Sequence, residues 1–129
     1  PGAKDVGVPG FIDTMLKDCY KKEDQDRFLE GLTAFDAEAK ATYGDSFIYC
    51  QPEQQVELVK KIHDAAVAEA KDNREAKRPF ILMTKELTLL GFFTSEPGAT
   101  QVLQYEPVPG SYKGCIPLSE AGNGKTWAT

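Results

Sequence analysis

The sequence lacks most of the residue patterns on which enzymes depend. It has one histidine, His63, and its three cysteines form no CxxC pair, so the common zinc and dithiol redox motifs are excluded. No GxGxxG or GxxxxGK run is present to cradle a dinucleotide or a phosphate. Neither an HExxH motif nor a cluster of carboxylates occurs. We therefore expect no catalytic, cofactor-binding or metal-binding residue on this chain.

An excess of positive charge and a long hydrophobic run are also missing. Fifteen basic and twenty acidic residues leave a net charge of -5. The chain therefore lacks the excess of positive charge that attracts nucleic acid or an anionic lipid surface. The longest near-apolar run, residues 79–93, contains Lys85 and Glu86 and falls short of the ~18 apolar residues needed to cross a bilayer. We expect no nucleic-acid partner and no membrane span. The length of 129 residues predicts a single domain over residues 1–129.

Apolar residues recur at helical spacing over the first half of the chain. One stripe consists of Phe28, Leu32, Phe35, Ala39 and Tyr43. A second stripe consists of Val56, Val59, His63, Ala66 and Ala70. Gly44 is typical of the end of the first helix, and Pro52 is typical of the first turn of the next one. A shorter helix is expected over residues 10–20.

From Pro79 the pattern changes, because the apolar residues cover nearly the whole circumference of the next helix. Such a helix is usually central in its domain. We expect Gly91 to interrupt it and Ser95 to cap a short helix that ends at about Gln104. The prolines and glycines that follow predict ordered coil or a short edge strand at most. The predicted fold class is all-α: a small irregular helical domain of four to five helices with a Pro/Gly-rich ordered C-terminal tail.

His63 is the one candidate for acid–base chemistry. It lies alone on an apolar helix face, without a second histidine or a nucleophile at a useful spacing. A packed, hydrogen-bonded core residue is the better interpretation than a general base.

One long stretch of the sequence is distinctive. Residues 85–96 read KELTLLGFFTSE, and Gly98-Ala99-Thr100 follows. This stretch resembles the gluconate 2-dehydrogenase subunit 3 family. The resemblance extends to further residues on both sides: Asp18-Cys19, Phe28-Leu29, Leu103, Tyr105, Pro107-Val108-Pro109-Gly110, Tyr112, Gly114-Cys115 and Trp127-Ala128.

The resemblance implies a non-catalytic accessory subunit of an FAD-dependent gluconate or glucose-type dehydrogenase complex. FAD is then expected on a large partner subunit, and many such complexes also contain a cytochrome c subunit. Small subunits of the family commonly carry a twin-arginine export signal, although this chain has no Arg-Arg pair. We expect a periplasmic protein whose signal has been removed. The alternative is a free-standing periplasmic helical module that binds a protein or a ligand.

The apolar, sparsely charged second part of the chain is the expected partner surface. Residues 79–129 hold 7 of the 35 charged side chains. Aromatic residues dominate interface energetics, so Phe92, Phe93, Tyr105 and Tyr112 are the candidate contacts. The alternative is that these aromatics fill the core of the domain itself.

Composition alone leaves the three cysteines either as ordinary thiols or as one disulfide and a spare thiol. The resemblance favours a disulfide between Cys19 and Cys115, whose contexts look like the family, with Cys50 left over. An oxidising compartment would preserve such a bond. The rival hypotheses are three free thiols, or a bond from one cysteine to the large subunit.

Overall fold

The computed structural model describes residues 1–108 and 110–128. Pro109, which belongs to the resembling stretch, lies outside the described residues, as does Thr129. The all-α class is confirmed, since the described part contains helices and no β-strand. The α-helices are α1 (Val8–Cys19), α2 (Lys22–Tyr43), α3 (Pro52–Asp72) and α4 (Phe80–Phe93). Three short turns complete the fold: the 3-10 turns η1 (Phe47–Tyr49) and η3 (Leu118–Glu120), and the π-helical turn η2 (Gly98–Val102).

The chain divides into two compact units. One comprises Thr14–Glu86, and the other comprises Pro1–Asp13 together with Leu87–Thr129. Helices α1 and α4 each contribute residues to both units. Each unit is described by itself below, and the organisation of residues 1–129 as one domain remains a prediction.

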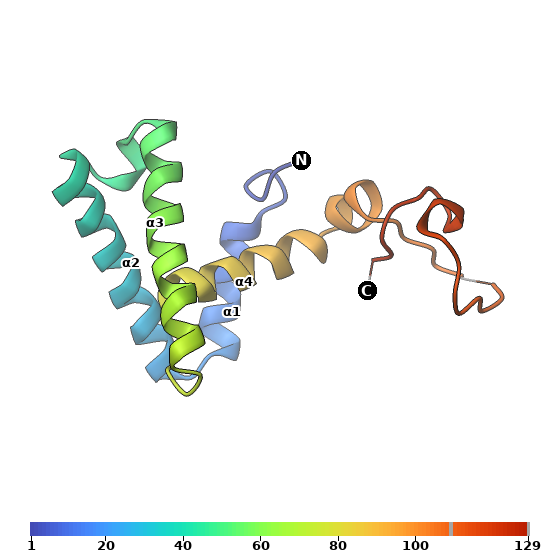
Figure 1. Cartoon of the computed structure of the whole chain (residues 1–129), viewed down its shortest axis with the longest axis horizontal. Coiled ribbons are helices and arrows are strands. Elements are labelled where there is room, and N and C mark those ends of the chain that lie inside the picture. Colours follow the sequence, from blue (N-terminus) through green and yellow to red (C-terminus); the bar gives the residue numbers. More distant parts are fainter. Residues whose placement is uncertain (109, 129) are drawn as a thin grey trace. The chain divides into compact units, whose positions relative to one another are not determined.

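The core of the Thr14–Glu86 unit lies between α2, α3 and the first turns of α4. Figure 1 shows α2 and α3 as an antiparallel pair joined at the η1 end. The buried cluster consists of Phe35, Ala39, Cys50, Leu58, Ala66, Ile81 and Leu82. Phe80 adds an edge-on contact with Phe28, with ring centroids 4.9 Å apart. Burial of this apolar surface is the main favourable contribution to folding of the unit.

The expected helix boundaries at the α2–α3 connection are confirmed. Gly44 adopts φ of 87° after α2, and its N–H donates to the Lys40 carbonyl at 2.9 Å. Glycine has no Cβ and takes this left-handed conformation at little cost. Pro52 begins α3, where its missing N–H is not needed. Gln51 precedes it and forms a reciprocal cap with Gln54.

The predicted buried stripe of α3 was wrong in the first half of the helix, although Ala66 is buried and Ala70 packs against the core as expected. Val56 and Val59 are exposed, at 67% and 39%, whereas Leu58 is fully buried. Ile62 packs against the core beside it. Apolar residues surround much of this helix, so periodicity alone did not determine which side faces inward.

On α2 the predicted stripe holds except at Leu32, which is 47% exposed. The neighbouring Gly31 forms the contact with α4 instead. A Cβ on Gly31 would lie 2.2 Å from the Cβ of Phe80, so the two helices approach closely where α2 has no side chain. A larger residue at position 31 would force them apart.

The expected break at Gly91 was also wrong, because α4 continues through it to Phe93. Gly91 is buried, and a Cβ there would lie 2.6 Å from the Cδ1 atom of Phe11. The glycine therefore provides space for an aromatic ring of α1 rather than ending the helix. The expectation of a central helix packed on several sides holds for the first turns of α4, where Ile81 and Leu82 are buried, but Leu89 and Leu90 are each 47% exposed.

Candidate interaction surface

The described residues contain no group of three or more His, Cys, Asp or Glu side chains that could hold a metal ion. Among the same residues, no helix is both long enough and apolar enough to cross a membrane. The candidate site considered below is a surface that begins where α4 ends.

Ser95 redirects the chain after α4. Its Oγ donates to the Phe92 carbonyl at 2.6 Å and accepts from the Gly98 N–H at 3.1 Å, which confirms the expected helix cap. The new helical turn ends at Val102 rather than at Gln104. Residue 104 is already extended, because its backbone pairs with the end of the chain.

Gln104 holds the tail together, a role that its sequence context did not indicate. Its backbone N–H donates to Thr126 O at 3.0 Å, and its carbonyl accepts from Ala128 N at 2.8 Å. Its side chain is buried, at 6% exposure. The side-chain amide donates to the carbonyls of Ala121 and Lys125 at 2.8 and 2.5 Å and accepts from Asn123 N at 3.0 Å. One polar side chain thus satisfies several backbone groups that lie in no regular element.

The four predicted contact residues all lie in the unit that contains this tail. Phe93, Tyr105 and Tyr112 are 37%, 60% and 95% exposed, and Phe92 is half-buried. The rings of Phe92 and Phe93 meet edge to face, with centroids 5.2 Å apart. Phe92 and Phe93 are therefore in part packing residues, whereas Tyr105 and Tyr112 are mostly exposed.

Further large apolar side chains are exposed in residues 87–128. They are Leu89, Leu90, Val102, Val108, Ile116, Leu118 and Trp127. Leu89 and Leu90 were expected in the interior, and the apolar face they form could not be located before the position of α4 was known. The charged residues of the same segment are few: Glu96, Glu106, Lys113, Glu120 and Lys125. A surface with many apolar and few charged side chains is typical of a site that another protein covers.

The structure gives the predicted disulfide no support. Cys19, Cys50 and Cys115 are all free thiols. Cys19 is exposed at the end of α1 in one compact unit, and Cys115 is exposed in the other. Cys50 is buried, with its sulfur 3.6 Å from the Ser46 carbonyl oxygen. The argument for export that rested on this pair has no structural backing.

His63 is hydrogen-bonded as expected but is not fully buried. Its Nδ1 lies 3.1 Å from Asp64 Oδ1, and its Nε2 lies 3.0 Å from Lys85 Nζ. The side chain is 26% exposed. Because the ammonium can only donate, Nε2 is the acceptor and the proton of the neutral ring resides on Nδ1. The imidazole thus links α3 to α4 through its contact with Lys85.

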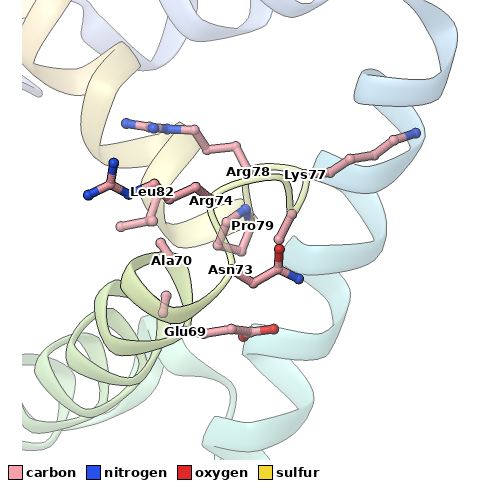
Figure 2. Close-up of a pocket in the computed structure, with 10 residues that line it drawn as sticks. Glu69, Ala70, Asn73, Arg74, Lys77, Arg78, Pro79 and Leu82 are labelled. Carbon is pink, nitrogen blue, oxygen red and sulfur yellow. The ribbon is translucent and has the colours of Figure 1, made fainter.

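A pocket of about 270 Å³ lies where α3 ends and α4 begins. Ala66, Ala70 and Leu82 supply apolar lining, and Asn73 and Pro79 belong to the connecting loop. Figure 2 shows the pocket in the Thr14–Glu86 unit.

The charged groups at this pocket balance one another. The lining includes three cations and one carboxylate: Arg74, Lys77, Arg78 and Glu69. The side chains of Arg74 and Arg78 extend toward the same side, whereas Lys77 points away (Figure 2). Lys77 pairs with Glu23 of α2. Arg78 pairs with Glu86 of α4. Three cations therefore face three carboxylates, and the pocket offers an anionic ligand no net attraction.

The described residues thus define a small all-α protein with apolar and aromatic side chains exposed on its C-terminal part. The sequence matches the family described as Gluconate 2-dehydrogenase subunit 3 over residues 1–110, and the chain belongs to that family. No curated protein and no solved structure was found to match it. The family match includes Phe92, Phe93 and Tyr105 but ends before Tyr112, so the resemblance suggested for residues 112–128 lies beyond the matched range.

Proposed function

We propose that this chain is the non-catalytic small subunit of a periplasmic FAD-dependent sugar or sugar-acid dehydrogenase complex. Family membership carries the proposal, because the family is named as a subunit of gluconate 2-dehydrogenase. The exposed aromatic side chains that follow α4 support it, since a subunit needs a surface for its partner.

FAD belongs on the large partner subunit in this proposal. The sequence has no glycine-rich run of the kind that holds a dinucleotide pyrophosphate. The described residues also contain no strand that could lead into such a turn. The small subunit would then support assembly and export of the flavoprotein, and a cytochrome c subunit would accept the electrons.

The partner surface in this proposal is formed by Phe92, Phe93, Tyr105 and Tyr112. Tyrosine and phenylalanine bury a large area at a small cost in side-chain entropy, because each has only two rotatable bonds. The backbone near Phe93 is held by the Ser95 cap. The backbone next to Tyr105 is held by the hydrogen bonds of Gln104. A surface fixed in advance loses less entropy when it binds.

The test is to express the flavoprotein in a host that lacks this chain, with and without the chain supplied on a plasmid. We expect less flavoprotein and less sugar-dehydrogenase activity in the exported fraction when the chain is missing, and recovery when it is supplied. Total flavoprotein in the cell is the control for expression. Equal export and equal activity in both strains would refute the proposed role.

A further inference from the structure

The turn η1 is fixed to both long helices of the Thr14–Glu86 unit. Asp36 of α2 accepts hydrogen bonds from Ser46 Oγ at 2.5 Å and from Phe47 N at 2.8 Å. Gln55 of α3 donates from Nε2 to the Phe47 carbonyl at 2.9 Å. Cys50 is buried directly after the turn. The backbone of η1 is therefore held by side chains of α2 and α3 at once.

The side chains of this fixed turn divide between the interior and solvent. Phe47 faces inward, with its ring centroid 4.8 Å from that of Phe35. Ile48 and Tyr49 are 71% and 73% exposed. Val56, which follows Gln55 on α3, is 67% exposed. We name Ile48, Tyr49 and Val56 the η1 surface.

Large apolar side chains on a rigid turn are well suited to binding. They gain by leaving water, and their backbone loses little entropy on association because it is already ordered. Tyrosine is also enriched among the residues that contribute most to interface affinity. The hydrogen bonds that hold η1 use the side chains of Asp36, Ser46 and Gln55. They do not require Ile48 and Tyr49 to be exposed, so folding of the unit does not explain that exposure.

The charges around the η1 surface indicate the kind of partner. Three exposed carboxylates, Asp45, Glu53 and Glu57, lie close to the residues of the η1 surface in the sequence, and Lys60 lies one turn along α3 from Val56, so negative charge predominates there. A second copy of this chain would bring the same carboxylates to the contact, and like charges oppose association. Lysine and arginine side chains around an apolar recess would be complementary.

We infer that the η1 surface docks into an apolar recess, rimmed by lysine and arginine side chains, on the large flavoprotein subunit. The inference rests on the proposed function, which supplies the identity of the partner. It adds a contact on the Thr14–Glu86 unit to the aromatic surface of residues 87–128. The small subunit would then hold its partner through both of its compact units.

The test uses the purified complex, with the affinity of the two subunits measured by titration. The double variant Ile48→Ala, Tyr49→Ala should weaken association at least about 30-fold, because two such contacts are each able to contribute that much. Leu29→Ala is the matched control, since Leu29 is a 57% exposed apolar residue of the same unit, about 20 Å along α2 from Tyr43. Circular dichroism should show an unchanged fold, because neither Ile48 nor Tyr49 belongs to the buried cluster.

Two further measurements identify the recess and its charge. A photo-crosslinking residue in place of Tyr49 should attach to a peptide of the flavoprotein that contains lysine or arginine. Raising the ionic strength should weaken the wild-type complex, and the variant Asp45→Asn, Glu53→Gln should show a smaller salt dependence.

The outcomes separate this inference from the proposed function. If the complex forms and the Ile48, Tyr49 variant binds like the wild type, the η1 surface is not a contact, although the small-subunit role stands. If the Leu29 variant is weakened equally, the contact is not localised at η1 and the inference is overturned. If the wild-type chain binds no flavoprotein, both the proposed function and this inference are wrong.

Discussion

The fold lowers the pKa of the Asp36 carboxyl group. Its carboxylate accepts hydrogen bonds from the Lys40 side chain, the Ser46 hydroxyl and the Phe47 N–H, in that order of effect. These donors lower the pKa of Asp36 from its ordinary value of 3.8 to about 2. A carboxylate that accepts several hydrogen bonds is favoured in its charged form.

The stability of the chain should therefore depend on the ionisation of Asp36. Because the folded chain binds this proton less tightly than the unfolded chain, the stabilisation is present above the unfolded pKa of 3.8 and is lost as the pH falls through about 2. Thermal unfolding across the acidic range should show a loss of stability that the variant Asp36→Asn lacks. Asp45→Asn, a change at an exposed carboxylate near the same turn, is the control. Parallel pH profiles for Asp36→Asn and the wild type would show that the carboxylate does not secure η1.

The three cysteines differ in exposure, and their reactivity should follow it. In the native protein a maleimide should modify Cys19 and Cys115, which are exposed, and should reach Cys50 only after unfolding. Intact-mass analysis would give two additions before denaturation and three after it. A single addition to the denatured, unreduced protein would instead reveal a disulfide and would restore the pairing that the family resemblance suggested.

At the scale of the element, the sequence predicted most helices and their ends because those depend on local chemistry. Gly44, Pro52 and Ser95 act at the helix ends as their side chains or backbones dictate. The contacts between helices were harder to predict from the sequence. At Gly31 and Gly91 a phenylalanine side chain of another helix packs against the glycine, and nothing in a local pattern distinguishes a glycine that makes room from one that ends a helix.

The tail after η2 depends on Gln104 in a way that no local pattern could indicate. Its amide satisfies backbone groups between residues 121 and 125, which are distant in the sequence. A single glutamine in a coil-forming region looks the same whether it is buried or solvated. Only the return of the chain to residues 126–128 buries it.

Replacement of this glutamine should release the tail. The variant Gln104→Ala leaves the carbonyls of Ala121 and Lys125 without their donor, which should cost about 1–3 kcal/mol. Limited digestion with trypsin should then cleave faster after Lys113 and Lys125, while helices α2 and α3 stay protected. Gln101→Ala, a change at an exposed position three residues before Gln104, should digest like the wild type. Equal digestion of the two variants would show that Gln104 does not organise the tail.

At the scale of the whole molecule, the expectation of exposed aromatic residues rested on charge density and on family resemblance. Phe93, Tyr105 and Tyr112 are accessible, as a contact role requires, although their role as contacts remains a prediction. No pattern in the sequence predicted the η1 surface. Ile48 and Tyr49 lie in a short apolar run beside Phe47, and only the fixed turn shows that Phe47 alone faces the interior.

The central claim, that this chain is the small subunit of a flavin-dependent dehydrogenase, is tested most directly by capturing an affinity-tagged copy from the exported fraction of its native host. We predict that a larger protein co-purifies in a fixed ratio, shows flavin absorbance and oxidises a sugar or a sugar acid. The double variant Phe93→Ala, Tyr112→Ala should recover much less of it, since true anchors contribute about 2 kcal/mol or more each. Recovery of the tagged chain alone, from a host that exports an active flavin-dependent sugar dehydrogenase, would contradict the account.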